Sequence, residues 1–179
     1  MSWLLGKLKS KVAPNESQST VDELTFKLTI EVKDEFKNFS KYKRIKVPVI
    51  YFSIQVFIND NELDQVFVED QFLQSLLHEG KYPMFTCTCG IFDCGGYYIE
   101  VIHRKDKLCW YAEDPPFKDL EIKSSNYFQF EWENVFEFTM ELVAQLDELN
   151  KLYDSKGLTR PYDLKEYYLT IEKLKKMRH

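Results

Sequence analysis

The chain has 179 residues, of which 44% are hydrophobic and 16% aromatic, and this is enough for one domain with a sizeable buried core. Its formal net charge of −5 argues against general nucleic-acid binding, because that binding needs cations to displace counterions from phosphate. We therefore expect no nucleic-acid partner. An acidic protein of this kind is expected to bind other proteins, particularly basic ones.

The apolar segments indicate the compartment. No apolar run approaches the ~20 residues that span a bilayer, and the apolar part of "MSWLLGKLKSK" is shorter than the core of a signal peptide. We therefore expect a cytoplasmic protein. Glutathione and thioredoxin keep cytosolic thiols reduced, so the four cysteines are expected to be free thiols or metal ligands rather than structural disulfides.

Residues 1–20 are expected to form an N-terminal segment and linker ahead of a single domain over residues 21–179. Within residues 1–12, an apolar set and three lysines are typical of a short basic amphipathic helix. The apolar residues are Trp3, Leu4, Leu5, Leu8 and Val12, and the lysines are Lys7, Lys9 and Lys11. Such a helix lies on an anionic membrane or docks on a partner. The alternative is a helix packed on its own domain or a frayed terminus.

The next segments predict strands and one short helix. "LTFKLTIEVK", residues 24–33, alternates apolar and polar residues without a break and predicts a half-buried strand. "VPVIYFSIQVFI" and "LDQVFV" are joined by the turn residues "NDNE", so residues 47–68 predict a hairpin. "EDQFLQSLLHEG" then changes to helical spacing, and Gly80 is placed to end that helix.

The middle of the chain predicts an antiparallel meander. "MFTCTC" and "YYIEVIH" flank a cysteine-rich turn, "RKDK" turns the chain into "KLCWY", and Phe128, Phe130 and Trp132 alternate in a further strand. Two helices follow. Asn134 is the predicted N-cap of a long helix, which ends at Gly157. The apolar stripe of that helix is Phe138, Leu142, Leu146, Leu149 and Tyr153.

A capping box at Asp163 and Glu166 predicts the last helix. Its apolar residues are expected to be Leu164, Tyr168, Ile171 and Leu174. Taken in order, these elements predict an α+β fold, with a mostly antiparallel sheet and helices packed on one face.

The stretch "TCTCGIFDCGG" holds the candidate metal site. In a strand, residues i and i+2 point to the same face, so Cys87 and Cys89 can converge, and Cys94 returns after a short turn. These three cysteines are the candidate zinc ligands, with the fourth ligand unknown. The predicted register places His103 roughly 25 Å from the turn, and Cys109 also lies at the wrong end.

Other interpretations of this turn stay open. One is a tight glycine-rich hairpin lined by small buried thiols, which needs no cofactor. Another is a redox pair of Cys89 and Cys94, although their spacing differs from the C-x-x-C arrangement that lowers a thiol pKa. A cysteine nucleophile paired with His78 or His103 lacks an orienting third group. We assign no catalytic residue.

Four stretches resemble a bacterial protein family to which no activity is assigned. They are "FSIQVFINDNEL", "MFTCTCGIFDCGG", a hairpin ending in "CWY", and "YFQFEWENVFEFTMEL", within residues 50–146. The family pattern has a core "LL-x-C-x-C-G-x-x-G-C" and a tryptophan that closes the next hairpin. The resemblance implies no function. It does imply that one structural unit contains Cys87, Cys89, Gly90, Cys94 and Trp110.

Two charged stretches are candidate binding surfaces. "EFKNFSKYKRIK", residues 35–46, interleaves aromatic residues with cations, a composition that can stack bases and neutralise phosphates. The alternative, which we favour, is that these lysines keep a sheet edge soluble. Four glutamates lie among Trp132, Phe136 and Phe138 and suggest an acidic, aromatic patch for a basic partner. They are Glu131, Glu133, Glu137 and Glu141. The alternative is a solvated face with the aromatic rings in the core.

The leading hypothesis is a non-enzymatic cytosolic factor that binds another protein, as immunity, antitoxin or counter-defence inhibitors do. The first alternative is a zinc- or thiol-dependent enzyme centred on Cys87, Cys89 and Cys94. The second is a membrane-surface adaptor that uses the basic amphipathic helix of residues 1–12.

Overall fold

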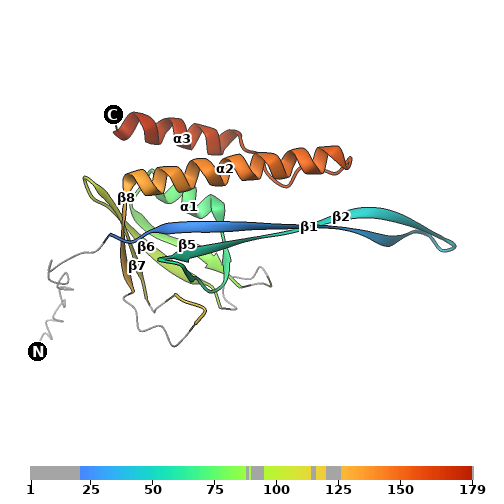
Figure 1. The fold of residues 1–179 in the computed structure, drawn as a ribbon, viewed down its shortest axis with the longest axis horizontal. Coiled ribbons are helices and arrows are strands. Elements are labelled where there is room, and N and C mark those ends of the chain that lie inside the picture. The colour runs from blue at the N-terminus through green and yellow to red at the C-terminus, as the bar shows by residue number, and fades with distance from the viewer. Residues whose placement is uncertain (1–20, 88, 90–94, 114–115, 120–125, 179) are drawn as a thin grey trace, which may run out of the picture.

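The structure is a computed structural model that describes residues 21–87, 89, 95–113, 116–119 and 126–178. Within these ranges the chain forms eight strands and three helices, with every strand pair antiparallel. The strands make two sheets, of order β1-β2-β3 and β4-β5-β6-β7-β8. Figure 1 shows the helices on one side of the strands. The predicted α+β class is confirmed.

A long hairpin is the most extended part of the molecule (Figure 1). Strand β1 (Leu24–Ser40) pairs with β2 (Lys43–Ile58) from Leu24 opposite Ile58 to Ser40 opposite Lys43. The strand predicted over residues 24–33 is therefore confirmed, and it continues to Ser40. It continues because the β-branched run at the start of β2 supplies cross-strand partners well past residue 33.

The hairpin predicted over residues 47–68 is wrong in its second strand. Asn59 and Asp60 do make the turn, with φ of 51° and 64°, as the common two-residue hairpin turn requires. However, only β3 (Asn61–Glu62) returns along β2, and β4 (Val66–Phe67) belongs to the other sheet. Strand β2 pairs over nearly its whole length with β1 on one edge and only with the two residues of β3 on the other.

The second sheet is the predicted meander, except that its last strand ends at Glu131 and Trp132, predicted in that strand, begins helix α2. It contains β4, β5 (Gly80–Thr86), β6 (Tyr97–His103), β7 (Lys107–Ala112) and β8 (Tyr127–Glu131). Helix α1 (Glu69–Ser75) connects β4 to β5. The helix ends earlier than predicted, because Leu76 and Leu77 donate their N–H groups to the carbonyls three residues back and tighten the chain into a turn. Gly80 begins β5 rather than ending the helix, so that expectation was wrong.

Helix α2 (Trp132–Ser155) follows β8 directly and carries the predicted apolar stripe. Four of the five stripe residues are buried, and Tyr153 is half-buried. Gly157, with φ of +66°, ends this segment as predicted, and its N–H donates to Asp154 O. The predicted cap is wrong. Asn134 lies inside the first turn, and Glu131 occupies the cap position without a side-chain hydrogen bond.

Helix α3 (Lys165–Arg178) packs on α2. Asp163 Oδ1 accepts a hydrogen bond from Lys165 N at 3.1 Å, so the predicted capping at Asp163 is present. The buried tyrosine is Tyr167, not Tyr168, which is 47% exposed. A spacing of three, four and three residues keeps Leu164, Tyr167, Ile171 and Leu174 on one stripe, whereas Tyr168 falls on its flank.

One cluster of buried side chains joins the two sheets and the helices. Phe72 of α1 lies at its centre, with ring centroids 5.1 Å from Phe138 of α2 and 6.1 Å from Trp110 of β7. Phe26 of β1 meets the edge of Phe138 at 5.1 Å. Helix α2 is therefore the element that holds the long hairpin against the meander.

Candidate functional site

The cysteine turn begins immediately after β5, and the structure joins Cys87 to Cys89 by a disulfide. The sequence had predicted thiols or metal ligands here, and for this pair that expectation was wrong. Residues i and i+2 of an extended chain project to the same side, and the two Cα atoms are 5.4 Å apart, within the range that a disulfide spans. Cys94 and Gly90 lie outside the described residues.

The three-cysteine zinc site therefore stays a prediction. Two of its proposed ligands are thiolates only after reduction, because a disulfide sulfur is not a thiolate ligand. Among the described residues, no group of three or more His, Cys, Asp or Glu side chains is placed to hold a metal ion. Elemental analysis for zinc, with a thiol count before and after reduction, is the direct test.

The other candidate partners of the turn lie at the far end of the meander. Tyr97, at the start of β6, pairs with Phe85 beside the turn, whereas His103 pairs with Leu108 at the other end of the strand. Six residues of strand separate the two ends by about 20 Å. His103 is also engaged, since its Nε2 lies 2.8 Å from Ser75 O and its backbone N–H donates to Glu79 Oε1.

Cys109 is 1% exposed and pairs with Ile102 on β6, so it too is remote from the turn, as predicted. Trp110, which the family resemblance groups with the cysteines, is fully buried. Its ring meets the edge of Phe85 at 6.5 Å, and Phe85 lies two residues before Cys87. The tryptophan therefore supports the strand from which the turn departs. It does not by itself define a site.

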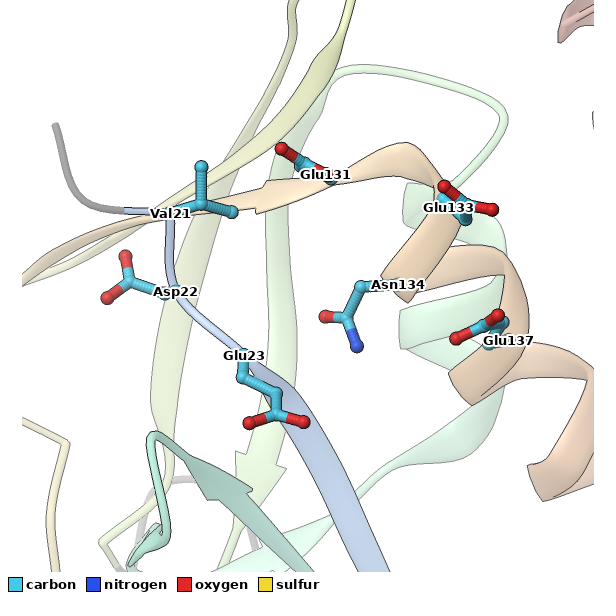
Figure 2. A pocket seen from close by; sticks show the side chains of 7 residues that line it. All are labelled: Val21, Asp22, Glu23, Glu131, Glu133, Asn134 and Glu137. Carbon is cyan, nitrogen blue, oxygen red and sulfur yellow. The ribbon is translucent and has the colours of Figure 1, made fainter.

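A hollow of about 350 Å³ lies where the start of β1 meets the junction of β8 and α2 (Figure 2). We call it the acidic hollow, and its lining residues are Val21, Asp22, Glu23, Glu131, Glu133, Asn134 and Glu137. Five of these seven side chains are carboxylates. Three of the predicted acidic patch residues, Glu131, Glu133 and Glu137, are thus brought together, while Glu141 is one helical turn further along.

Hydrogen bonds hold the frame of the acidic hollow in place. Asp22 Oδ2 accepts from Gln129 N at 2.8 Å, and Asp22 N–H donates to Gln129 O at 2.8 Å, which ties the chain to β8. Asn134 Oδ1 accepts from Leu24 N at 2.9 Å, and its Nδ2 donates to Leu24 O at 3.2 Å, which ties β1 to α2. No local pattern in the sequence indicated these contacts across more than 100 residues.

The remaining carboxylates of the hollow are not neutralised. Within the part of the chain that the structure describes, Glu23, Glu131, Glu133 and Glu137 form no ion pair with a lysine or arginine. All four side chains are exposed. On helix α2, Glu141 adds one more carboxylate near the hollow, whereas Asp147, Glu148 and Asp154 lie further along and are paired with Lys151 or Arg160. The hollow therefore attracts cations over a distance set by the salt concentration.

The aromatic residues beside these glutamates are not part of the surface. Trp132 and Phe138 are 8% and 4% exposed, and Trp132 Nε1 donates to Arg104 O at 3.0 Å. Phe136 is half-buried, with Lys175 of α3 over its ring. The aromatic rings therefore lie in or against the core beneath the exposed glutamates, as the alternative interpretation expected, and the binding role of the acidic face stays a prediction.

A second cluster of ionisable groups joins α1 to α3 and was missed by the sequence patterns. Tyr162 donates to Glu69 Oε1 at 2.7 Å, and Tyr167 donates to Asp70 Oδ1 at 2.6 Å. Burial raises the pKa of Glu69 above the usual range of a carboxyl group. Burial, with the adjacent carboxylates, also raises the pKa of both tyrosines. These hydrogen bonds connect α1 to α3 and to the segment just before it.

Comparisons with protein-family models, with curated proteins and with solved structures found no match to this chain. The amphipathic helix predicted over residues 1–12 lies outside the described residues. No helix in the described ranges combines the length and the apolar character that a membrane crossing requires.

Proposed function

We propose that the protein works by binding a basic partner protein in the acidic hollow, in the manner of an immunity, antitoxin or counter-defence factor. The observation that supports this proposal is the group of un-neutralised carboxylates on a fixed frame. Glu131, Glu133 and Glu137 come from β8 and α2, while Glu23 comes from the start of β1. A partner surface rich in lysine or arginine complements that arrangement in charge.

The rigidity of the frame favours recognition. Asp22 and Asn134 are occupied by backbone hydrogen bonds, so they set the positions of the neighbouring glutamates without themselves being available to a ligand. A fixed backbone frame loses less conformational entropy when a partner binds, although the exposed glutamate side chains must still be ordered. At about 350 Å³, the hollow has room for a long basic side chain reaching in from a partner surface.

Electrostatic binding of this kind has a defined experimental signature. Charge complementarity accelerates association, and the acceleration falls as salt rises because the Debye length shortens from about 10 Å at 0.1 M to about 3 Å at 1 M. The affinity for the native partner should therefore weaken with salt. A mutation in the hollow should change the association rate more than a mutation elsewhere.

The test begins by isolating a stoichiometric partner from the native host and measuring its association rate by biolayer interferometry. The double variant Glu133→Lys/Glu137→Lys reverses two charges of the hollow and should slow association about tenfold or more at low salt. The control variant Glu100→Lys/Glu166→Lys makes the same change in net charge at exposed positions outside the hollow. Equal effects of the two double variants, or repeated failure to recover any partner, would contradict the proposal.

A further inference from the structure

The long hairpin extends past the end of the helical layer as a bare two-stranded ribbon (Figure 1). The helical side contacts the hairpin at Ile50, whose carbonyl accepts from Tyr153 Oη at 3.3 Å, and at Phe52, whose ring lies 5.9 Å from Tyr162. Beyond them burial decreases quickly along β1. Val32, directly opposite Ile50, is already 43% exposed, and Phe36, four residues further along, is 68% exposed.

The far end of this ribbon is strongly basic. We call residues 36–46 the hairpin tip, and its charged residues are Lys37, Lys41, Lys43, Arg44 and Lys46, with no acidic residue among them. Removing these five positive charges from the net charge of −5 leaves −10 on the rest of the chain. The fold therefore separates charge along the molecule, and the average charge describes neither end.

Three of the five tip cations make exposed contacts that can be replaced. Lys46 lies 3.3 Å from Asp34, with both side chains more than half exposed. Arg44 Nε donates to the neutral amide of Asn38 at 3.1 Å, so its positive charge is oriented but not cancelled. Lys41 lies over the ring of Tyr42 at 5.6 Å. Because exposed contacts of this kind contribute little free energy, the cations can leave them to bind an anion such as phosphate.

Two large aromatic rings stand among these cations. Phe36 is 68% exposed and Tyr42, in the turn of the hairpin, is 90% exposed. If the lysines served only to keep a sheet edge soluble, exposed rings would oppose that purpose. Phe36 lies in β1 and Tyr42 lies in the turn after Ser40, so the two exposed rings are presented by different parts of the tip.

We propose that the hairpin tip binds single-stranded nucleic acid, with its cations on the phosphates and with Phe36 and Tyr42 stacked on bases. A basic surface that follows the backbone, combined with aromatic faces for stacking, is the general chemistry of such binding. The acidic body does not prevent it. The start of β1, beside the acidic hollow, is about 50 Å of strand from the tip, several times the Debye length of about 8 Å in physiological salt.

The probe is a fluorescein-labelled 20-mer of deoxythymidine, and a matching uridine 20-mer, titrated with the full-length protein from 50 to 200 mM salt by fluorescence anisotropy. Each phosphate contact on a single strand contributes about −0.7 to the slope of log affinity against log salt. Five contacts therefore predict a slope of about −3.5. The variant Lys37→Gln/Lys41→Gln/Arg44→Gln removes three of these contacts and should reduce the magnitude of the salt slope by about 2.

Two further variants separate charge from stacking. Phe36→Ser/Tyr42→Ser should weaken binding roughly tenfold or more with the salt slope retained, and should have no effect on an abasic oligonucleotide of the same charge. The matched control is Lys165→Gln/Lys173→Gln/Lys176→Gln, three exposed lysines on α3, which should bind as the unmodified chain does. All substituted side chains are exposed, and circular dichroism verifies that each variant is folded.

Three outcomes would overturn the proposal. The first is no anisotropy change with either oligonucleotide at 50 mM salt. The second is an equal loss of binding in the α3 control, which would make the interaction a general charge effect. The third is flotation with phosphatidylserine vesicles that depends on Lys37, Lys41 and Arg44 while oligonucleotides do not bind, which would assign the tip to a membrane surface.

Discussion

Replacing Asn134 tests how the long hairpin is fastened to helix α2. Strand β1 is the edge of its sheet, and Asn59 N–H donates to Glu23 O on the side facing β2. Alternate residues of an edge strand point their backbone groups away from the neighbouring strand, so the N–H and C=O of Leu24 face outward. The amide of Asn134 satisfies both groups, at 2.9 and 3.2 Å.

The expected loss in the free energy of unfolding follows from these two hydrogen bonds. Asn134→Ala leaves both Leu24 groups without a side-chain partner, at a cost of about 1 to 3 kcal/mol each when burial is complete. The hydrogen bonds are only partly buried, so water replaces some of the loss, and we expect about 2 kcal/mol in total. Asn134→Asp keeps the acceptor for Leu24 N–H but places a carboxylate against Leu24 O and beside four glutamates.

The free energy of unfolding of the Asn134→Asp variant should also depend on pH. The neighbouring carboxylates and the Leu24 carbonyl raise the pKa of the new acid in the folded state above its unfolded value. The folded state then binds the proton more tightly, so the variant loses free energy of unfolding, relative to the unmodified protein, as pH rises. We expect about 1 kcal/mol or less of destabilisation at pH 5 and about 2 to 3 kcal/mol at pH 8.

Urea unfolding at pH 5, 6.5 and 8, followed by tryptophan fluorescence, measures these differences. The control is Gln145→Glu, which adds the same charge to α2 at a side chain whose contact is a surface hydrogen bond to Glu141. It should change the free energy of unfolding by roughly 0.5 kcal/mol or less. An Asn134→Ala cost below that value, or an Asn134→Asp cost independent of pH, would refute the role assigned to this amide.

Two other substitutions give definite expectations. Burial raises the pKa of Glu69, so the free energy of unfolding of the unmodified protein decreases as pH rises from the unfolded-state pKa toward the folded-state pKa. Glu69→Gln keeps an acceptor for Tyr162 and removes the titrating group. Its free energy of unfolding should therefore decrease less with pH, and it should be the more stable form at pH 7. Parallel urea stability profiles from pH 4 to 7 would argue against this. Among the described residues, the buried Nε1 of Trp110 has no hydrogen-bond partner, so Trp110→Phe removes an unsatisfied donor and should cost about 1 kcal/mol, against about 3 to 5 kcal/mol for Trp110→Ala. Equal midpoint shifts for the two substitutions in urea would contradict that account.

The candidate surfaces were only partly visible in the sequence. The run of cations over residues 36–46 and the glutamates from Glu131 to Glu141 can both be read directly from composition. Their separation cannot, because it depends on a hairpin that carries the cations away from the helices (Figure 1). Glu23 joins the glutamates of α2 through folding alone, since more than 100 residues lie between them.

The sequence by itself determined the local periods and turns of this protein. The alternation in β1, the stripe of α2, the turn at Asn59 and the stop at Gly157 each arise from residues close together in the chain. The cysteine spacing likewise brings Cys87 and Cys89 to one side of the strand, although the disulfide between them was not expected.

Only the tertiary structure decided the pairings. Residues 47–58 pair with β1 along one edge over a long register, whereas on the other edge only the two residues of β3 pair before the chain leaves for the second sheet. Asn134 has the chemistry of an N-cap, yet its amide serves Leu24, because an edge strand packed alongside presents unpaired backbone groups that must be satisfied. A local pattern specifies which groups need a partner, whereas long-range packing selects the partner that each group obtains.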